Sequence, residues 1–210
     1  MVMSESIPKT QTVALIRAQG SPIEFVSDYP VPKPTASEVL VKILYTGVCQ
    51  SDLHTKNGTA TGPDGKPITA IKLPHIGGHE GVGKVISHPC ADQSIKDGTL
   101  VGIRFLSRVC HQCEYCATDR EQHCAKSKNH LHHEDGSFQE YCVLDTSYLT
   151  VLPDDVDPIV VGPTLCAGVT AYKAVKNAGL KEGEWLVVVG AGGGLGHFAG
   201  KYMNVGTGRL

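Results

Sequence analysis

Four cysteines lie close together in the chain, separated by three, three and eight positions: Cys110, Cys113, Cys116 and Cys124. A structural zinc ion takes four ligands at the corners of a tetrahedron, and short C-x-x-C turns bring pairs of sulfur atoms to one point. Because four thiolates leave no position for water or substrate, we expect this metal to be structural. A cluster of disulfide bonds is the weaker alternative, since nothing else in the chain suggests secretion and adjacent C-x-x-C pairs form strained bridges.

A second set of metal-binding residue types is spread along the chain at Cys49, His79 and Cys166. Two thiolates and one imidazole on zinc leave the fourth position free, as a catalytic site requires. Cys49 and His79 lie in glycine-flanked bends, where a rigid backbone can orient a ligand. Taken singly, each of these residues is more often part of a core. The spacing therefore leaves a catalytic metal site as a hypothesis.

A glycine-rich stretch near the end of the chain has the composition of a phosphate-binding loop. Residues 184–189 are almost entirely apolar, which is typical of a parallel strand buried on both faces. The candidate cofactor-binding residues come directly after it: Gly190, Gly192, Gly193, Gly194, Leu195 and Gly196. When such a loop joins a strand to a helix, its glycines admit a pyrophosphate and the helix offers free N–H groups. A strict G-x-G-x-x-G does not fit because position 191 is alanine, and a flexible turn is the alternative.

The elements that must position these residues change in character along the chain. Up to about residue 155, short apolar runs broken by proline and glycine predict strands near residues 13–17, 23–26, 39–45, 83–86, 98–104 and 136–144. A short helix is predicted just after Gly47. An acidic, proline-bounded hinge comes next at residues 153–158, and beyond it we predict a helix with Pro163 in its first turn. Its predicted apolar stripe comprises Leu165, Val169, Tyr172 and Val175, and Gly179 is its predicted C-terminal stop.

Composition narrows the class of protein. The formal net charge of −2 argues against nucleic acid or an anionic membrane as the main partner. No apolar run approaches the roughly 20 residues of a membrane span. The N-terminus shows neither a basic nor an apolar region of a signal peptide, and the 8 cysteines therefore indicate reduced thiols and metal in a cytoplasmic protein. Cys90 and Cys142 have no assigned role and are predicted to be packing cysteines.

Several motifs together carry a resemblance to a known family. The chain resembles the zinc-dependent alcohol dehydrogenases of the medium-chain dehydrogenase/reductase family, most closely the yeast and fungal type. The motifs lie between residues 40 and 200: Gly47-Val-Cys49-Gln-Ser51-Asp-Leu-His54, Gly77-Gly-His79-Glu80-Gly-Val-Gly83, the four-cysteine stretch, Asp135-Gly-Ser-Phe-Gln139, Leu165-Cys166-Ala-Gly-Val-Thr170 and Gly193-Gly-Leu-Gly196.

The resemblance implies a fold and a division into domains. It implies a mostly β, GroES-like catalytic domain over residues 1–158, followed by the incomplete start of an α/β Rossmann domain over residues 159–210. Relatives of this type continue for well over a hundred residues. We therefore expect a truncated chain with most of the NAD site missing, whose own activity is doubtful. Full-length relatives are homo-oligomers, and the resemblance leaves the oligomeric state of this chain open.

The resemblance also implies residue roles. Cys49, His79 and Cys166 match ligands of the catalytic zinc, and the four clustered cysteines match ligands of a structural zinc, giving two Zn²⁺ per chain. Asp52 and Glu80 match carboxylates that support the catalytic metal. Ser51 matches the hydroxyl that receives the alcohol proton, and His54 the outer end of that proton relay. Thr170 and Leu195 match residues beside the nicotinamide of NAD.

The implied reaction interconverts small alcohols and aldehydes or ketones by hydride transfer between the substrate carbon and NAD. Two alternatives stay open. One is a polyol dehydrogenase, although those enzymes tend to carry a glutamate near the position of Cys166. The other, from a different class, is a non-catalytic zinc-binding remnant of a dehydrogenase.

Overall fold

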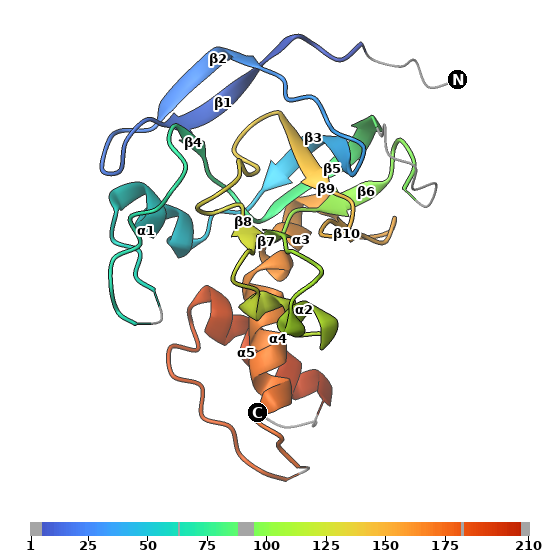
Figure 1. Cartoon of the computed structure of the whole chain (residues 1–210). Coiled ribbons are helices and arrows are strands. Elements are labelled where there is room, and N and C mark those ends of the chain that lie inside the picture. The colour runs from blue at the N-terminus through green and yellow to red at the C-terminus, as the bar shows by residue number, and fades with distance from the viewer. Residues whose placement is uncertain (1–5, 63, 88–94, 182, 207–210) are drawn as a thin grey trace.

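A computed structural model describes residues 6–62, 64–87, 95–181 and 183–206, with side chains as far as residue 203. Cys90 lies outside the described residues. The first 150 or so residues form mainly strands, and helices dominate the C-terminal part (Figure 1). The change in character predicted near residue 155 is therefore confirmed.

A five-stranded antiparallel sheet forms the centre of the molecule, with the strand order β10-β6-β5-β3-β9. Its longest strand, β3, pairs with β5 on one side and β9 on the other. Its strands are β3 (Glu38–Thr46), β5 (Gly81–Ser87), β6 (Leu100–Gly102), β9 (Tyr141–Asp145) and β10 (Thr150–Val151). The strands β3, β5, β6 and β9 were thus correctly predicted, although those near 98–104 and 136–144 are shorter than predicted, and β10 was not predicted.

Two smaller sheets accompany the central one. A three-stranded sheet has the order β2-β1-β4, and β7 pairs with β8 in a two-stranded sheet. The strands are β1 (Thr10–Ile16), β2 (Glu24–Pro30), β4 (His75–Ile76), β7 (Leu106–Arg108) and β8 (Lys128–Asn129). An isolated bridge between Val13 and Gln139 joins β1 to the segment that leads into β9.

The main hydrophobic core lies against the central sheet. Alternate residues of a strand point to the same face, and the core members Val39 and Val41 on β3 keep this period. Cys142 and Leu144 on β9 keep the same period and are 1% and 2% exposed. Cys142 is therefore a packing cysteine, as predicted. A separate cluster under β1 contains Val13, Leu15 and Ile76.

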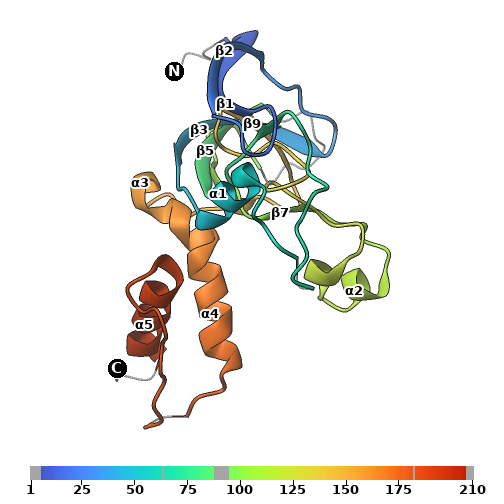
Figure 2. The ribbon, with the colours of Figure 1, turned by 90° about the vertical axis from the view of Figure 1, so that its left-hand side faces the viewer.

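The helices lie in three places. The helix α1 (Gln50–Asn57) connects β3 to the long loop before β4. A protruding lobe carries α2 (Glu114–Ala117) and the 3-10 turn η1 (Glu121–His123). The C-terminal part contains α3 (Pro158–Val161), η2 (Gly162–Leu165), α4 (Ala167–Asn177) and α5 (Gly194–Gly206), and α4 packs along α5 away from the sheets (Figures 1 and 2).

The predicted apolar stripe of the C-terminal helix is wrong in part. Pro163 lies in η2 and not in the first turn of α4. Val169 and Tyr172 are 55% and 50% exposed, whereas the small residues Gly168 and Ala171 are buried in α4. The reason is that α5 packs on this small-residue face, where Gly168 lies against the Tyr202 and Phe198 side chains. Gly179, with φ of +63°, comes after the helix in the left-handed conformation, as predicted.

The buried parallel strand predicted over residues 184–189 is also wrong. No described strand pairs with this segment, and Trp185, Val187 and Val189 are 86%, 85% and 94% exposed. A parallel strand forms only when neighbouring strands satisfy its backbone groups and helices cover its faces. The described part of the chain places neither beside it.

No single helix among the described residues is long and apolar enough to cross a membrane. The bent pair Pro158–Leu165 and Ala167–Asn177, which meet at 49°, passes that test only when both are taken together.

Candidate metal centres

The structure brings Cys49, His79 and Cys166 together with Glu80. One ligand atom from each of the four lies within 4.8 Å of every other. Cys49 Sγ and Cys166 Sγ are 4.0 Å apart, although 117 positions separate them in sequence. Tetrahedral zinc with Zn–S bonds of about 2.3 Å places two sulfur atoms about 3.8 Å apart. The spacing and the donor types of this cluster therefore fit a zinc ion.

Three segments at the ends of regular elements position these ligands. Cys49 precedes the first turn of α1, His79 and Glu80 lie between β4 and β5, and Cys166 joins η2 to α4. Gly47 lets the first two segments approach, because a Cβ at this position would lie 2.1 Å from Glu80 Oε2. Its N–H group donates to the Glu80 carbonyl at 3.1 Å. Gly78 adopts φ of +100°, a conformation that favours glycine, and so turns the chain just before His79.

Asp52 organises this cluster from within α1. Its carboxylate accepts hydrogen bonds from the backbone N–H groups of Cys49 at 3.0 Å and Gly78 at 3.1 Å. It also lies 3.2 Å from Nδ1 of His79. A carboxylate only accepts, so His79 carries its proton on Nδ1 and leaves Nε2 to bind a metal. The supporting role predicted for Asp52 thus has the required geometry.

The electrostatics of the cluster favour positive charge at its centre. Burial lowers the pKa of His79, but the Asp52 carboxylate and the Cys166 sulfur outweigh burial and raise that pKa to about 11. Burial acts to raise the pKa of the Cys49 thiol, but hydrogen bonds with Ser51 and the nearby His79 hold it below its ordinary value. A divalent cation supplies the positive charge that these groups favour.

The four clustered cysteines also converge, in the lobe that contains α2. Neighbouring sulfur atoms lie 3.5 Å apart for Cys113 and Cys116, 3.6 Å for Cys124 and Cys110, and 3.9 Å for Cys110 and Cys116. These distances match the edge of a ZnS₄ tetrahedron. They exclude disulfide bonds, whose sulfur atoms are about 2.05 Å apart. The disulfide alternative is therefore ruled out for this lobe.

The thiols of this lobe cannot all ionise side by side. Backbone N–H groups of Gln112 and Cys113 lower the pKa of Cys110 to about 6. Burial and the neighbouring sulfur atoms raise the pKa of Cys116 to about 12. One thiolate thus suppresses the next, and a cation bound to all four sulfur atoms removes this repulsion. The donor set fits a structural zinc ion.

Comparison with known proteins shows which family has this architecture. The family model of the alcohol dehydrogenase GroES-like domain matches residues 35–154. The chain belongs to this family. The mostly β, GroES-like fold inferred from the motifs is therefore confirmed.

Two alcohol dehydrogenases and a reductase are similar to this chain over most of its length. The alcohol dehydrogenase of Schizosaccharomyces pombe (strain 972) is 39% identical over 199 residues, which are 94% of this chain and 55% of that protein. The structure of an acetophenone reductase from Geotrichum candidum in complex with NAD is 26% identical with a TM-score of 0.81, covering 97% of this chain and 57% of that one. A cinnamyl alcohol dehydrogenase from Sorghum bicolor is 28% identical with a TM-score of 0.79, covering 95% and 56%. The chain thus spans a little over half the length of these relatives.

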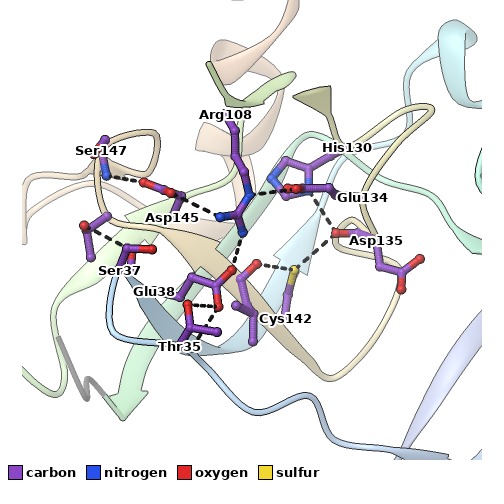
Figure 3. A network of polar contacts seen from close by, with 12 residues as sticks. Thr35, Ser37, Glu38, Arg108, His130, Glu134, Asp135, Cys142, Asp145 and Ser147 are labelled. Atoms are coloured by element: carbon purple, nitrogen blue, oxygen red, sulfur yellow. Dashed lines mark hydrogen bonds and ion pairs between the residues drawn. The ribbon is translucent and has the colours of Figure 1, made fainter. Parts of the chain in front are cut away.

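Arg108 ties the cysteine lobe of this GroES-like domain to the central sheet (Figure 3). Its Nε donates to Glu134 at 2.7 Å and its Nη1 to Asp145 at 3.4 Å, while Nη2 donates to Glu38. Glu38 begins β3, Asp145 ends β9, and Arg108 ends β7 two residues before Cys110. Sequence reasoning missed this contact, because the three carboxylates come from distant positions and share no motif.

The residues predicted for proton transfer lie on α1. Ser51 Oγ is 3.5 Å from Cys49 Sγ, at the edge of the metal cluster. His54 is exposed, and its Nδ1 is 2.9 Å from Thr59 Oγ1. Their roles stay predictions. Glu80 was expected only to support the metal, yet its carboxylate lies among the candidate ligands.

The residues predicted to hold NAD form only part of the expected cofactor site. Thr170 is exposed on α4, one turn after Cys166. The loop Gly190–Gly193 turns into α5, and Gly196 is the tight point, since a Cβ there would lie 2.3 Å from the Gly190 carbonyl oxygen. Leu195 is 52% exposed. The loop and helix predicted here are present, whereas the strand that should precede them is not.

Proposed function

We propose that this chain provides the metal- and substrate-binding part of a zinc-dependent oxidoreductase that interconverts alcohols and aldehydes or ketones with NAD. The observation that carries this proposal is the convergence of Cys49, His79 and Cys166 beside Asp52. Family membership supports the reaction class, and the 39% identical relative is an alcohol dehydrogenase. NAD is proposed by analogy with the acetophenone reductase, whose structure contains it.

In this proposal each chain holds two zinc ions. Cys49, His79 and Cys166 would hold the catalytic ion, with Glu80 as a further oxygen donor within reach. Cys110, Cys113, Cys116 and Cys124 would hold the structural ion. At the catalytic position zinc supplies Lewis acidity toward an alcohol or carbonyl oxygen.

The chain's own polar groups would then handle the proton. Ser51, whose Oγ lies 3.5 Å from Cys49 Sγ, would accept the proton of an alcohol directed at the cluster. His54 is exposed and would release the proton to water, because histidine is the residue type suited to proton exchange near neutral pH. Asp52 would hold His79 in the tautomer that presents Nε2, so that the cluster keeps its shape while the proton moves.

The partner of this site would be a small alcohol or aldehyde, and nucleic acid or membrane partners are not proposed. A reducing compartment such as the cytoplasm suits the chain, because the seven cysteines that the structure describes are all free thiols. Metal binding through thiolates requires that state.

One observation favours a second candidate function, a zinc-binding domain without catalysis of its own. Trp185, Val187 and Val189 are exposed and no described strand pairs with residues 184–189, so the strand that should support the cofactor loop is not formed. Hydride transfer needs that loop to hold NAD beside the metal.

Metal analysis and turnover on the purified chain separate the two candidates. The oxidoreductase proposal expects two zinc ions per chain and NADH formation from a panel of primary and secondary alcohols. The Cys166→Ser variant should lose turnover and one zinc ion while keeping the other. Two zinc ions without turnover would favour the non-catalytic domain. Fewer than two zinc ions in the unmodified chain would contradict the two-site proposal itself.

A further inference from the structure

One motif of the sequence, Asp135-Gly-Ser-Phe-Gln139, has no role in the proposed reaction. It lies between β8 and β9, and its backbone is bound to the residues just before His79. Three successive N–H groups of the motif donate to carbonyl groups there: Gly136 to Ile76 at 2.7 Å, Ser137 to Gly78 at 2.9 Å, and Phe138 to Gly77 at 2.9 Å. The motif therefore supports the segment that carries a candidate metal ligand.

The motif is itself fixed by further hydrogen bonds. The Asp135 carbonyl accepts from Nδ1 of His130 at 2.8 Å (Figure 3). The Asp135 carboxylate accepts from the Ile76 N–H group at 3.1 Å. The Phe138 carbonyl accepts from the N–H group of Ala14 on β1 at 2.9 Å. Because these bonds reach both β1 and the residue after β8, the motif has a fixed place from which it can hold a ligand segment.

The side chain of Ser137 packs against the ligand segment on both sides of His79 and Glu80. Ser137 is 1% exposed. A Cβ at Gly78 would overlap the Ser137 hydroxyl, and a Cβ at Gly81 would overlap the Ser137 Cβ. The two glycines thus make room for this one side chain, and Ser137 limits how the segment between them can move.

The Ser137 hydroxyl also connects this segment to the one that carries Cys49. Its Oγ lies 2.6 Å from Oγ1 of Thr46, three residues before Cys49. The Thr46 hydroxyl has a single proton and donates it to the Gly47 carbonyl at 3.0 Å, so Ser137 is the donor to Thr46. The Gly47 N–H group donates in turn to the Glu80 carbonyl at 3.1 Å. One side-chain contact and one backbone contact therefore hold the two segments together.

We propose that Ser137 is a positioning residue for the metal cluster, which sets the spacing between the Cys49 and His79 segments through the Thr46 hydroxyl. Ser137 is not among the candidate ligands found in the described residues, so it acts only through these segments. Groups outside the ligands orient the ligands and tune the metal they hold. This inference deepens the proposed function: it rests on a metal ion at the Cys49 cluster, but not on hydride transfer.

Substitution of cobalt for zinc tests the proposal, because the visible absorption bands of Co²⁺ report the geometry of its ligands. Cys166→Ser should keep cobalt only in the cysteine lobe, and its spectrum is subtracted to isolate the Cys49 cluster. We expect Ser137→Ala to shift the bands of this cluster. Competition with a chelator should show an affinity about fivefold lower there, the value of one lost hydrogen bond, and an unchanged affinity in the lobe.

Variants of Thr46 show whether Ser137 acts through this residue. Thr46→Val keeps the shape but removes the hydroxyl, and should have the same effect as Ser137→Ala. The double variant should be no worse than either single variant, because both remove the same hydrogen bond. Thr46→Ser keeps the hydroxyl and should retain the native bands and affinity.

Ser107→Ala is the matched control for the loss of a buried serine hydroxyl. Ser107 lies on β7, is 2% exposed, and its hydroxyl has no hydrogen-bond partner among the described residues. Its replacement should leave the cobalt bands and both affinities unchanged.

Three results would overturn the positioning role while leaving the proposed metal site intact. The first is unchanged bands and affinity in both Ser137→Ala and Thr46→Val. The second is an equal loss of affinity at both metal sites, which would indicate a general loss of stability. The third is additive losses in the double variant, which would mean that the two hydroxyl groups act separately. Absence of cobalt from the Cys49 cluster of the unsubstituted chain would instead contradict the proposed function, and this inference with it.

Discussion

Nδ1 of His79 donates to the Asp52 carboxylate at 3.2 Å, and this contact decides which nitrogen of the ring can bind a metal. Both residues are almost fully buried, at 1% and 7% exposure. The pair connects α1 to the segment before β5, so one carboxylate sets both the position of a loop and the chemistry of a ligand.

Asp52→Asn tests this contact. The substitution keeps the side-chain shape but removes the charge that orients and polarises His79. We expect zinc affinity at the Cys49 cluster to fall by about 10- to 100-fold, as is typical when the partner of a ligand histidine is changed. Competition with a chelator measures this affinity. The zinc ion of the cysteine lobe should be unaffected and serves as the control. Equal loss of both ions would point to general unfolding instead.

The cysteine lobe should depend on its metal. Cys113→Ser removes one of four sulfur ligands and is expected to release one zinc ion per chain and lower the melting temperature, because structural zinc binding contributes directly to folding. Cys142→Ala is the matched control, since Cys142 is buried in the main core and is no ligand. Metal analysis should find two zinc ions in the control. A full zinc complement in Cys113→Ser would refute the four-sulfur site.

Arg108 should stabilise the junction between the lobe and the sheet. Arg108→Met leaves three carboxylates facing one another, and we expect a loss of about 2–3 kcal/mol in the free energy of unfolding. This is below the roughly 3–5 kcal/mol of a fully buried pair because 34% of the Arg108 side chain is exposed. Urea unfolding measures the change. Arg108→Lys keeps the charge but not the forked geometry, so its free energy of unfolding should lie between those of the native protein and Arg108→Met. Equal stability of all three proteins would contradict the role.

Buried His75 should make the chain sensitive to acid. Its pKa is lowered mainly by burial, from 6.5 to about 4. Between these two pH values the imidazole is therefore protonated in the unfolded chain but neutral in the folded chain. Stability is therefore full above about pH 6.5 and falls as the pH drops toward 4, by about 3 kcal/mol from this group.

Denaturant unfolding between pH 7 and pH 4 checks the effect of His75. His75→Leu should reduce the change in unfolding free energy with pH. His123→Gln, at an exposed position, should leave that pH dependence unchanged. If His75→Leu keeps the full slope, the titration belongs to other groups.

Trp185 reports on the segment whose structure the sequence pattern predicts wrongly. It is the only tryptophan of the chain and is 86% exposed. Its fluorescence should resemble that of an indole in water and be quenched by iodide as efficiently in the folded as in the unfolded protein. Protection from iodide in the folded chain would mean that residues 184–189 are covered after all.

Short sequence patterns predicted the structure correctly where the interacting residues lie close together in the chain. The four-cysteine lobe was predicted because its ligands lie within one short stretch, and Sγ distances of 3.5–3.9 Å agree with it. The strand near residues 136–144 was predicted because burial alternates along β9, where Cys142 and Leu144 are buried and their neighbours are only partly buried. The residue 184–189 strand failed because an apolar run specifies a strand only when partner strands are present.

The sequence by itself determined the residue types of both metal clusters, the mostly β character and the family. Only the tertiary structure decided that Cys49, His79 and Cys166 meet, that Asp52 turns the His79 ring, and that Arg108 joins three distant carboxylates. The physical reason is the distance along the chain over which each interaction acts. Hydrophobic alternation and short cysteine turns act between near neighbours, whereas ligand convergence depends on how sheets and helices pack, which no single stretch of the chain encodes.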